Sequence, residues 1–294
     1  MAKKVLIITL FSGENEFCDC ISSIMKQSYK NFDHTIIANY PNIEAHRSLY
    51  SLIMERADRY DLFIKIDADM VLKNNNVIGD VVEYIELNGN IDHAIFSLMD
   101  WMTGEIILGM HAFSPNAKWE KTSESLFVDP FPMIPGERAI VKAEPSPVAD
   151  HSPNPSVMQA FFFGYHRALK VVQRDRVEKK LSQINSQLIV LSSIWSKLKA
   201  NKDKRFAASI YGAECAFRDG GKHFLRKSAE QMPDLSFLDT HDLDSFTSKY
   251  SFWWDKNRFG YKIRALQFIL IPDLVNRVFK FKKRLLRVIK GLAC

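Results

Sequence analysis

Residues 62–70 read Leu62-Phe63-Ile64-Lys65-Ile66-Asp67-Ala68-Asp69-Met70. The first five residues form a short, mostly apolar run, which is typical of a buried strand. Two carboxylates, Asp67 and Asp69, follow it directly. Open α/β sheets bind ligands at the carboxyl ends of parallel strands, and residues i and i+2 of a strand point the same way. We therefore expect both aspartates to face one cation.

Strands and helices alternate on either side of this segment. We predict strands over 5–11, 34–38 and 62–66, separated by helices over 16–27 and 43–57. Such alternation implies right-handed crossovers and a parallel sheet. A helix over 77–87 and two strands joined by a turn at Thr103-Gly104 continue the pattern, the strands running from 93 to 99 and from 106 to 113. The fold class predicted for this part is α/β.

The pattern changes after residue 113. Eight of the eleven prolines lie between 114 and 155, which predicts a loop-rich stretch where binding residues collect. A heptad-like apolar series then predicts a long helix packed against a second helix over 206–217; its members are Val177, Leu181, Ile184, Leu188, Leu191, Trp195 and Leu198. We expect a catalytic α/β domain over 1–165 and a helical region over 166–294.

Positive charge is concentrated at the carboxyl end. Residues 256–294 contain eleven Lys and Arg and one acid, whereas the first 255 residues contain 29 basic and 33 acidic side chains. Apolar residues from Leu274 to Leu292 are spaced as one face of a helix, and basic residues occupy much of the rest. This pattern predicts an amphipathic helix on an anionic membrane surface, or else a terminal helix docked on the core. Nucleic-acid binding is not expected, because the main body is acidic and carries no such motif.

Other features restrict the class of protein. With 47% hydrophobic and 25% charged residues the chain can bury a large core, which excludes intrinsic disorder and small disulfide scaffolds. The four cysteines lack the spacing of a disulfide framework or a zinc site, so we expect reduced thiols in the cytoplasm. The apolar stretch 5–11 is too short for a secretion signal, and no stretch reaches the roughly 18 apolar residues of a membrane span.

The first 160 residues or so resemble the nucleotide-sugar glycosyltransferases of the GT-A fold. The resemblance rests on a polar loop over 11–16, on Asp67-Ala68-Asp69, and on a stretch similar to that superfamily's Ser-Ile…Gln-x-Tyr-x-Asn-Phe pattern, Ile24-Met25-Lys26-Gln27-Ser28-Tyr29-Lys30-Asn31-Phe32. It implies a Rossmann-like, mostly parallel sheet and a nucleotide-sugar donor. Carboxylate oxygens suit Mn²⁺ or Mg²⁺ together with substrate phosphate oxygens. The alternative for the two aspartates is that one caps the next helix and the other is solvated.

The resemblance also implies roles for other residues. Asp67 and Asp69 would hold the metal on the donor diphosphate, and a late histidine often completes the coordination. His151, within Asp150-His151-Ser152-Pro153-Asn154-Pro155, is the candidate, or else a loop histidine bonded to backbone. Ser12, Glu14 and Asn39, at the ends of the first two strands, are candidates to contact the nucleoside.

The catalytic base is less well defined by the sequence. The Glu-Asp pair that usually supplies the base in bacterial inverting enzymes is missing. Asp129 and Glu137, in the proline-rich stretch, and Asp100, at a strand end, are the candidates, each with the alternative of an ordinary surface acid.

Together these patterns predict a metal-dependent glycosyltransferase. The expected acceptor is a lipid-linked or cell-surface polysaccharide or lipopolysaccharide, reached at the inner face of a bacterial membrane through the basic helix. One alternative is a haloacid-dehalogenase-like phosphatase with Asp67 as nucleophile and Asp69 as acid/base, although Tyr84 stands where its second acidic pair requires an aspartate. A second alternative is a non-catalytic membrane-surface adaptor. Metal-dependent binding of a nucleotide sugar distinguishes the transferase from the adaptor.

Overall fold

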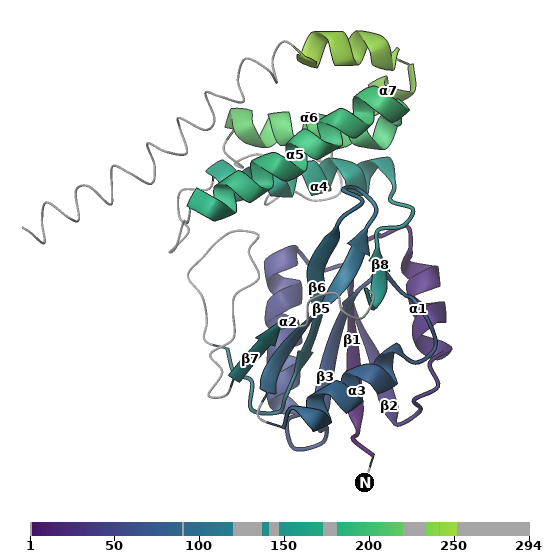
Figure 1. Cartoon of the computed structure of the whole chain (residues 1–294), viewed down its shortest axis with the longest axis vertical. Coiled ribbons are helices and arrows are strands. Elements are labelled where there is room, and N and C mark those ends of the chain that lie inside the picture. The colour runs from purple at the N-terminus through teal and green to yellow at the C-terminus, as the bar shows by residue number, and fades with distance from the viewer. Residues whose placement is uncertain are drawn as a thin grey trace, which may run out of the picture. The chain divides into compact units, whose positions relative to one another are not determined.

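The parallel half of the sheet is built from the three strands that the sequence predicts. The computed structural model describes residues 2–89, 91–119, 137–140, 147–172, 181–219, 233–240 and 242–251. Strand β1 (Val5–Phe11) lies between β2 (Phe32–Ala38) and β3 (Leu62–Asp67), parallel to both. Helices α1 (Phe17–Met25) and α2 (Asn42–Glu55) connect these strands. The carboxyl ends of the three strands therefore lie at one edge of the sheet (Figure 1).

The other half of the sheet contains antiparallel pairs. After β4 (Met70–Leu72) and helix α3 (Val77–Leu87), strands β5 (Ile91–Asp100) and β6 (Ile106–Phe113) form the expected hairpin, and β6 pairs antiparallel with β3. The α/β class is thus confirmed, but the sheet is mixed, because a short hairpin connection forces its two strands to run in opposite directions.

A short strand from the proline-rich stretch completes the sheet. Strand β8 (Ala149–His151) lies between β5 and β4, so the order is β2-β1-β3-β6-β5-β8-β4. Strand β7 (Glu137–Ile140) pairs parallel with β5 outside this path. The register brings Asp100, His151 and Met70 side by side across β5, β8 and β4. Asp69 immediately precedes Met70, so Asp69, Asp100 and His151 lie close together at this end of the sheet.

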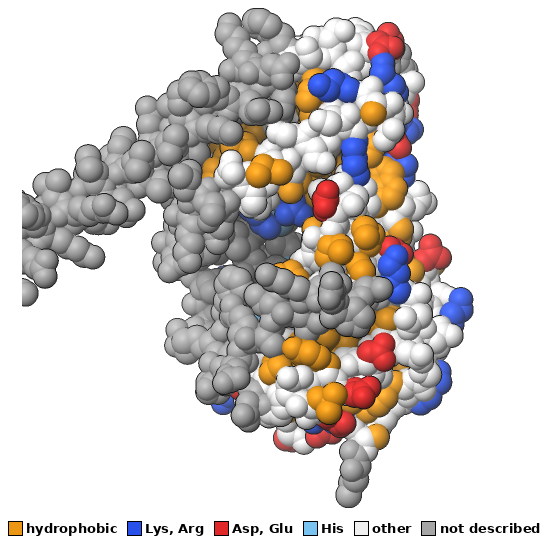
Figure 2. Space-filling view, viewed as in Figure 1, with side chains coloured by type: hydrophobic (Ala, Val, Ile, Leu, Met, Phe, Trp, Pro, Cys, Tyr) orange, Lys and Arg blue, Asp and Glu red, His pale blue; other side chains and the backbone are white. Residues whose placement is uncertain are grey.

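Helices cover both faces of the sheet. One buried cluster packs α1 and α3 against one face, and includes Ile24, Ile64, Ile78 and Phe96. A second cluster packs α2 on the opposite face and includes Leu49, Ile53 and Phe63. The strand side chains alternate between the two clusters, because successive residues of a strand point to opposite faces. On the face seen in Figure 2, acidic, basic and hydrophobic side chains of the described residues are intermixed.

The remaining described residues are helical. The chain divides into two compact units between Phe163 and Gly164, within α4 (Val157–Val172). In the second unit α5 (Leu181–Asn201) packs on α6 (Lys204–Asp219), followed by the short α7 (Phe237–Thr240) and a helix described from residue 243 to 251.

The predicted seam between the long helix and its partner is confirmed where it is described. All five of its members from position 184 onward are buried, namely Ile184, Leu188, Leu191, Trp195 and Leu198. No helix among the described residues is both long and apolar enough to span a bilayer. The basic segment from Leu274 lies outside the described residues, as does Asp129.

Candidate functional site

Asp67 ends β3 next to a buried lysine. The Lys65 Nζ atom lies 3.1 Å from Asp67 Oδ2, and the lysine side chain is only 6% exposed against 31% for the aspartate. Residues 65 and 67 share a face of the strand, which places the two opposite charges together. The charge of Asp67 is therefore balanced within the chain by a lysine two residues away.

Asp69 lies in the turn after β3 and not in the strand. Strand β3 ends at Asp67 and β4 begins at Met70, so the alternation of strand side chains does not extend to Asp69. The expectation that both aspartates face one cation because of strand alternation therefore loses its basis. The backbone oxygen of Asp69 accepts a hydrogen bond from the Ser152 amide at 2.7 Å, and its Oδ2 accepts one from the Ser152 hydroxyl at 2.8 Å.

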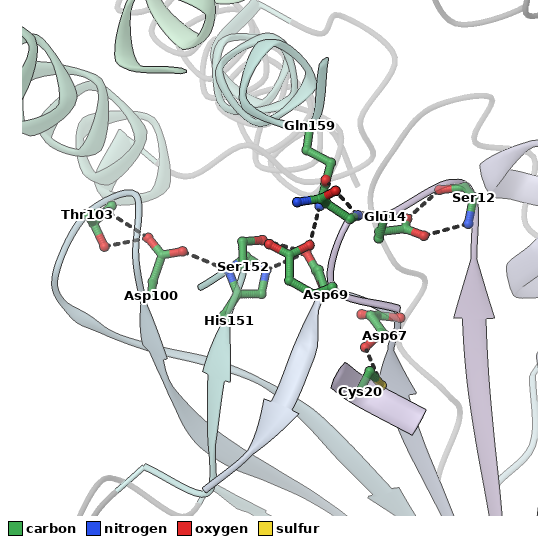
Figure 3. A network of polar contacts seen from close by, with 12 residues as sticks. Ser12, Glu14, Cys20, Asp67, Asp69, Asp100, Thr103, His151, Ser152 and Gln159 are labelled. Atoms are coloured by element: carbon green, nitrogen blue, oxygen red, sulfur yellow. Dashed lines mark hydrogen bonds and ion pairs between the residues drawn. The ribbon is translucent and has the colours of Figure 1, made fainter. Parts of the chain in front are cut away.

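His151 lies between two carboxylates. Its Nε2 is 3.3 Å from Asp69 Oδ2, and its Nδ1 is 2.7 Å from Asp100 Oδ1. Figure 3 shows the imidazole between the two aspartates, with Thr103 on the far side of Asp100. Both ring nitrogens of His151 therefore face carboxylates, a geometry unlike that of the alternative, a loop histidine bonded to backbone. Asp69 does not cap α3 either, because the N-cap position of that helix is Asn76.

Asp100 is fully buried and already bonded on both oxygens. Its Oδ2 accepts hydrogen bonds from the Thr103 amide at 2.9 Å and the Thr103 hydroxyl at 2.6 Å. Burial by itself raises the pKa of Asp100, but the hydrogen bonds from His151 and Thr103, together with the charge of His151, leave the pKa below its ordinary value. A carboxylate with no exposed surface and a lowered pKa is a poor base for an acceptor hydroxyl, so the structure argues against the predicted role of Asp100.

Of the two other candidate bases, only the backbone of Glu137 lies among the described residues. The backbone of Glu137 pairs with Ile91, at the opposite end of β5 from Asp100. At about 3.3 Å per strand residue, this separation is roughly 30 Å along the strand. The predicted role of Glu137 therefore has no geometric support, because β7 joins the wrong end of β5. Asp129 lies outside the described residues.

The loop after β1 reaches the same edge of the sheet. The Glu14 carboxylate accepts hydrogen bonds from the Ser12 amide and hydroxyl, at 2.6 and 2.5 Å. Burial raises the pKa of Glu14, the Ser12 hydrogen bonds oppose that effect, and the negative charge of Asp69 adds to it. Asn39, at the end of β2, is exposed, and its amide bonds to the Phe11 carbonyl at 2.9 Å. Ser12, Glu14 and Asn39 thus lie at strand ends, as predicted.

A buried glutamate connects this loop to the loop that follows His151. Glu16 is 1% exposed and accepts hydrogen bonds from the Asn154 amide at 3.0 Å and from Gln159 Nε2 at 2.7 Å. The Gln159 Oε1 atom in turn accepts a hydrogen bond from the Asn15 backbone amide at 2.9 Å. Sequence reasoning missed this network, because Glu16 has the pattern of an ordinary helix start and Gln159 adjoins three phenylalanines.

Cys20 packs beneath the site as an unreactive thiol. Its Sγ donates to the Asp67 carbonyl at 3.7 Å, and burial, followed by the charges of Asp69, Asp67 and Glu14, raises its pKa to about 12. The described cysteines Cys18, Cys20 and Cys215 are all free thiols.

The residues present fit a divalent cation with two protein donors. Among the described residues, no group of three or more His, Cys, Asp or Glu side chains is placed to hold a metal. A nitrogen and an oxygen 3.3 Å apart can still share one ion, since ligands about 2.1 Å from a metal lie roughly 3 Å from each other. The other ring nitrogen of His151 meets a carboxylate, as is usual for a ligating histidine.

Comparison with known proteins adds no family to this description. No protein-family model matches the chain, and no curated protein matches it significantly.

Proposed function

We propose that this chain is a metal-dependent glycosyltransferase that moves a sugar from a nucleotide-sugar donor to a glycan or glycolipid acceptor. The observation that carries the proposal is the close approach of Asp69 Oδ2 and His151 Nε2, at strand ends in an α/β sheet. Mn²⁺ and Mg²⁺ are commonly held by one or two protein side chains, with substrate phosphate oxygens in the remaining positions. The mixed sheet is compatible with a GT-A fold.

Each residue of the site has a distinct task under this proposal. Asp69 and His151 hold the cation, with Asp67 beside them at the end of β3. When bound, the metal supplies positive charge against the departing nucleotide phosphate. The loop carrying Ser12 and Glu14 is available to the nucleoside, because it follows the neighbouring strand β1.

The phosphatase alternative is less well supported. Its nucleophile would be Asp67, whose carboxylate pairs with buried Lys65. Its acid/base would be Asp69, whose Oδ2 accepts the Ser152 hydroxyl and faces His151. An acid that must donate a proton to a leaving group is better served by a protonated, unpartnered carboxyl. Release of inorganic phosphate from simple phosphate esters would favour this alternative.

The first experiment is a thermal-shift screen of nucleotide sugars, with Mn²⁺ and with chelator. At 100 times Kd, a ligand stabilises the folded state by about 2.7 kcal/mol, or roughly 5–10 °C. We expect the shift to require both Mn²⁺ and one donor class, and to vanish in Asp69→Asn.

The matched control is Asp150→Asn. Asp150 precedes His151 on β8 but pairs with Lys73 at 2.5 Å, so its loss should leave the shift intact. If no nucleotide sugar shifts the protein with Mn²⁺, or if Asp69→Asn responds as the intact chain does, the proposal is wrong.

We extend the proposal to an acceptor at the inner face of a membrane. This part rests on the basic amphipathic sequence from Leu274, which includes seven Lys and Arg. Each basic residue near an anionic surface contributes about 1 kcal/mol before screening. A chain ending before Leu274 should lose binding to vesicles that contain phosphatidylserine, while donor binding persists. An intact chain that ignores these vesicles would contradict the extension.

A further inference from the structure

We propose that Asp100 is a positioning residue that holds the ring proton of His151 on Nδ1 and so turns the Nε2 lone pair toward Asp69. This inference rests on the proposed metal site and deepens it. Asp100 and His151 are direct partners in the parallel pairing of β5 and β8, so the backbone itself sets the two side chains side by side.

The hydrogen bonds of Asp100 determine where the proton must be. Its Oδ2 accepts two donors from Thr103, and its Oδ1 faces His151 Nδ1 at 2.7 Å. A carboxylate has acceptors only, so this short contact requires a hydrogen on Nδ1. In the neutral ring the single proton is then used, and Nε2 must be an acceptor.

A proton on Nδ1 determines what the Nε2 side of the ring can bind. In this neutral tautomer Nε2 carries no proton, and it lies 3.3 Å from the Asp69 Oδ2 acceptor. Two acceptors this close repel each other, and a cation that binds to both would remove that repulsion. The buried Asp100 therefore acts on the metal through His151, without touching the ion. The Ser152 hydroxyl keeps Asp69 in place from a third direction, since it donates to the same Oδ2.

The Asp100→Asn substitution should reverse the tautomer. The two Thr103 donors would still need an acceptor, so the new amide oxygen would face Thr103 and the amide NH₂ would face His151. Nδ1 would then accept a hydrogen bond, and the proton would move to Nε2. A ring protonated at Nε2 cannot ligate a metal through that atom.

The matched control is Asp92→Asn on the same strand. Asp92 is also a buried carboxylate of β5, and its Oδ1 accepts hydrogen bonds from Ser114 Oγ at 2.5 Å and Asn116 Nδ2 at 3.1 Å. Asp92 lies eight residues from Asp100. The two side chains that bond to its Oδ1 atom, Ser114 and Asn116, are not part of the candidate site. Its substitution tests the general cost of neutralising a buried aspartate on β5.

The experiment reads the ring proton directly by ¹H–¹⁵N NMR of full-length, metal-free protein, at a pH where the His151 ring carries one proton. We expect the proton on Nδ1 in the unsubstituted chain and in Asp92→Asn, and on Nε2 in Asp100→Asn. Mn²⁺ titration should show affinity lowered about 10–100-fold in Asp100→Asn alone, the usual cost of losing such a partner.

Two results would overturn the inference: a proton on Nε2 in the unsubstituted chain, or equal Mn²⁺ affinity in Asp100→Asn. The first measurement needs no variant, so it decides the matter even if Asp100→Asn does not fold. Neither readout uses a donor sugar. A correct tautomer and Mn²⁺ response without any nucleotide-sugar binding would contradict the transferase proposal and leave this inference standing.

Discussion

The carboxylates at the ends of β1 and β3 are balanced differently from those around β8. Asp67 has a buried lysine, and Glu14 has two hydrogen bonds from Ser12. Asp69, in contrast, lies 3.3 Å from Nε2 of a histidine whose other nitrogen contacts Asp100. A carboxylate paired with a buried lysine contributes mainly to the fold, whereas one 3.3 Å from a histidine nitrogen can share a cation with it.

The largest effect should come from breaking the pair of Lys65 and Asp67. Asp67→Asn removes the carboxylate that lies 3.1 Å from the buried Lys65 ammonium, and this loss should cost about 3 kcal/mol of unfolding free energy. Lys65→Met should cost much less, because the Asp67 side chain is 31% exposed and can be hydrated. Urea denaturation of the two variants and of the double variant measures this asymmetry. Equal losses in the two single variants would contradict it.

The same variant compares the two aspartates as ligands. If Asp67 acts mainly on stability, folded Asp67→Asn should retain Mn²⁺ affinity that Asp69→Asn loses. A loss as large as that of Asp69→Asn would show that Asp67 also ligates the metal.

The next effect concerns His151. His151→Ala removes one of the two proposed metal ligands and should lower Mn²⁺ affinity roughly 10–100-fold, at least as much as losing an outer partner. The change in unfolding free energy should be smaller, since Asp69 keeps its hydrogen bond from Ser152. Calorimetric Mn²⁺ titration beside thermal denaturation separates the two quantities. An unchanged titration would return His151 to a purely structural role.

A smaller effect tests the link between the two regions. Glu16→Ala leaves the Asn154 amide and Gln159 Nε2 without their acceptor, at a cost of about 2 kcal/mol. Asp19→Ala, at an exposed position on the same α1 helix, should stay within about 0.5 kcal/mol of the unsubstituted chain. Chemical denaturation gives both values. If the two variants are equally stable, the network does not hold the loops.

The smallest effect is the pH dependence that Glu14 contributes. Its pKa in the folded chain lies above the ordinary 4.5, so the folded state binds this proton more tightly than the unfolded state does. The resulting stabilisation is present below pH 4.5 and is lost as the pH rises through the folded pKa. Glu14→Gln should therefore gain stability relative to the unsubstituted chain as the pH increases from about 4 to 7. A difference that does not change with pH would contradict this environment.

Secondary structure was predictable wherever it follows from a local repeat. The predicted spans of α3 and β6 agree with the structure, and the buried positions of α5 follow the heptad-like spacing. The direction of β6 relative to β3 was not predictable from those repeats. Alternation along a strand records which face is buried, but it does not record which strand lies alongside.

The candidate site likewise contains residues that the local sequence indicates and residues that only the folded chain brings together. The Asp67-Ala68-Asp69 segment can be recognised from the sequence, because two acids directly follow an apolar run. Asp100 was a candidate base because the sequence indicates that it ends a strand. The sequence does not indicate that its side chain is buried. Its partner His151 lies 51 residues away in sequence. The prolines around His151 favour a loop, so the sequence gives no sign of strand β8.

Local patterns in the chain were thus sufficient for the α/β class, the order of its first helices and strands, and the position of the two aspartates. The pairing of Asp100, His151 and Asp69 depends on the folded sheet, whereas Lys65 and Asp67 lie two residues apart on one face of a single strand. Side-chain periodicity arises from the geometry of neighbouring residues, whereas the register of β5, β8 and β4 is set by hydrogen bonds and packing between distant segments. Which carboxylates lie beside His151 is decided at that second level.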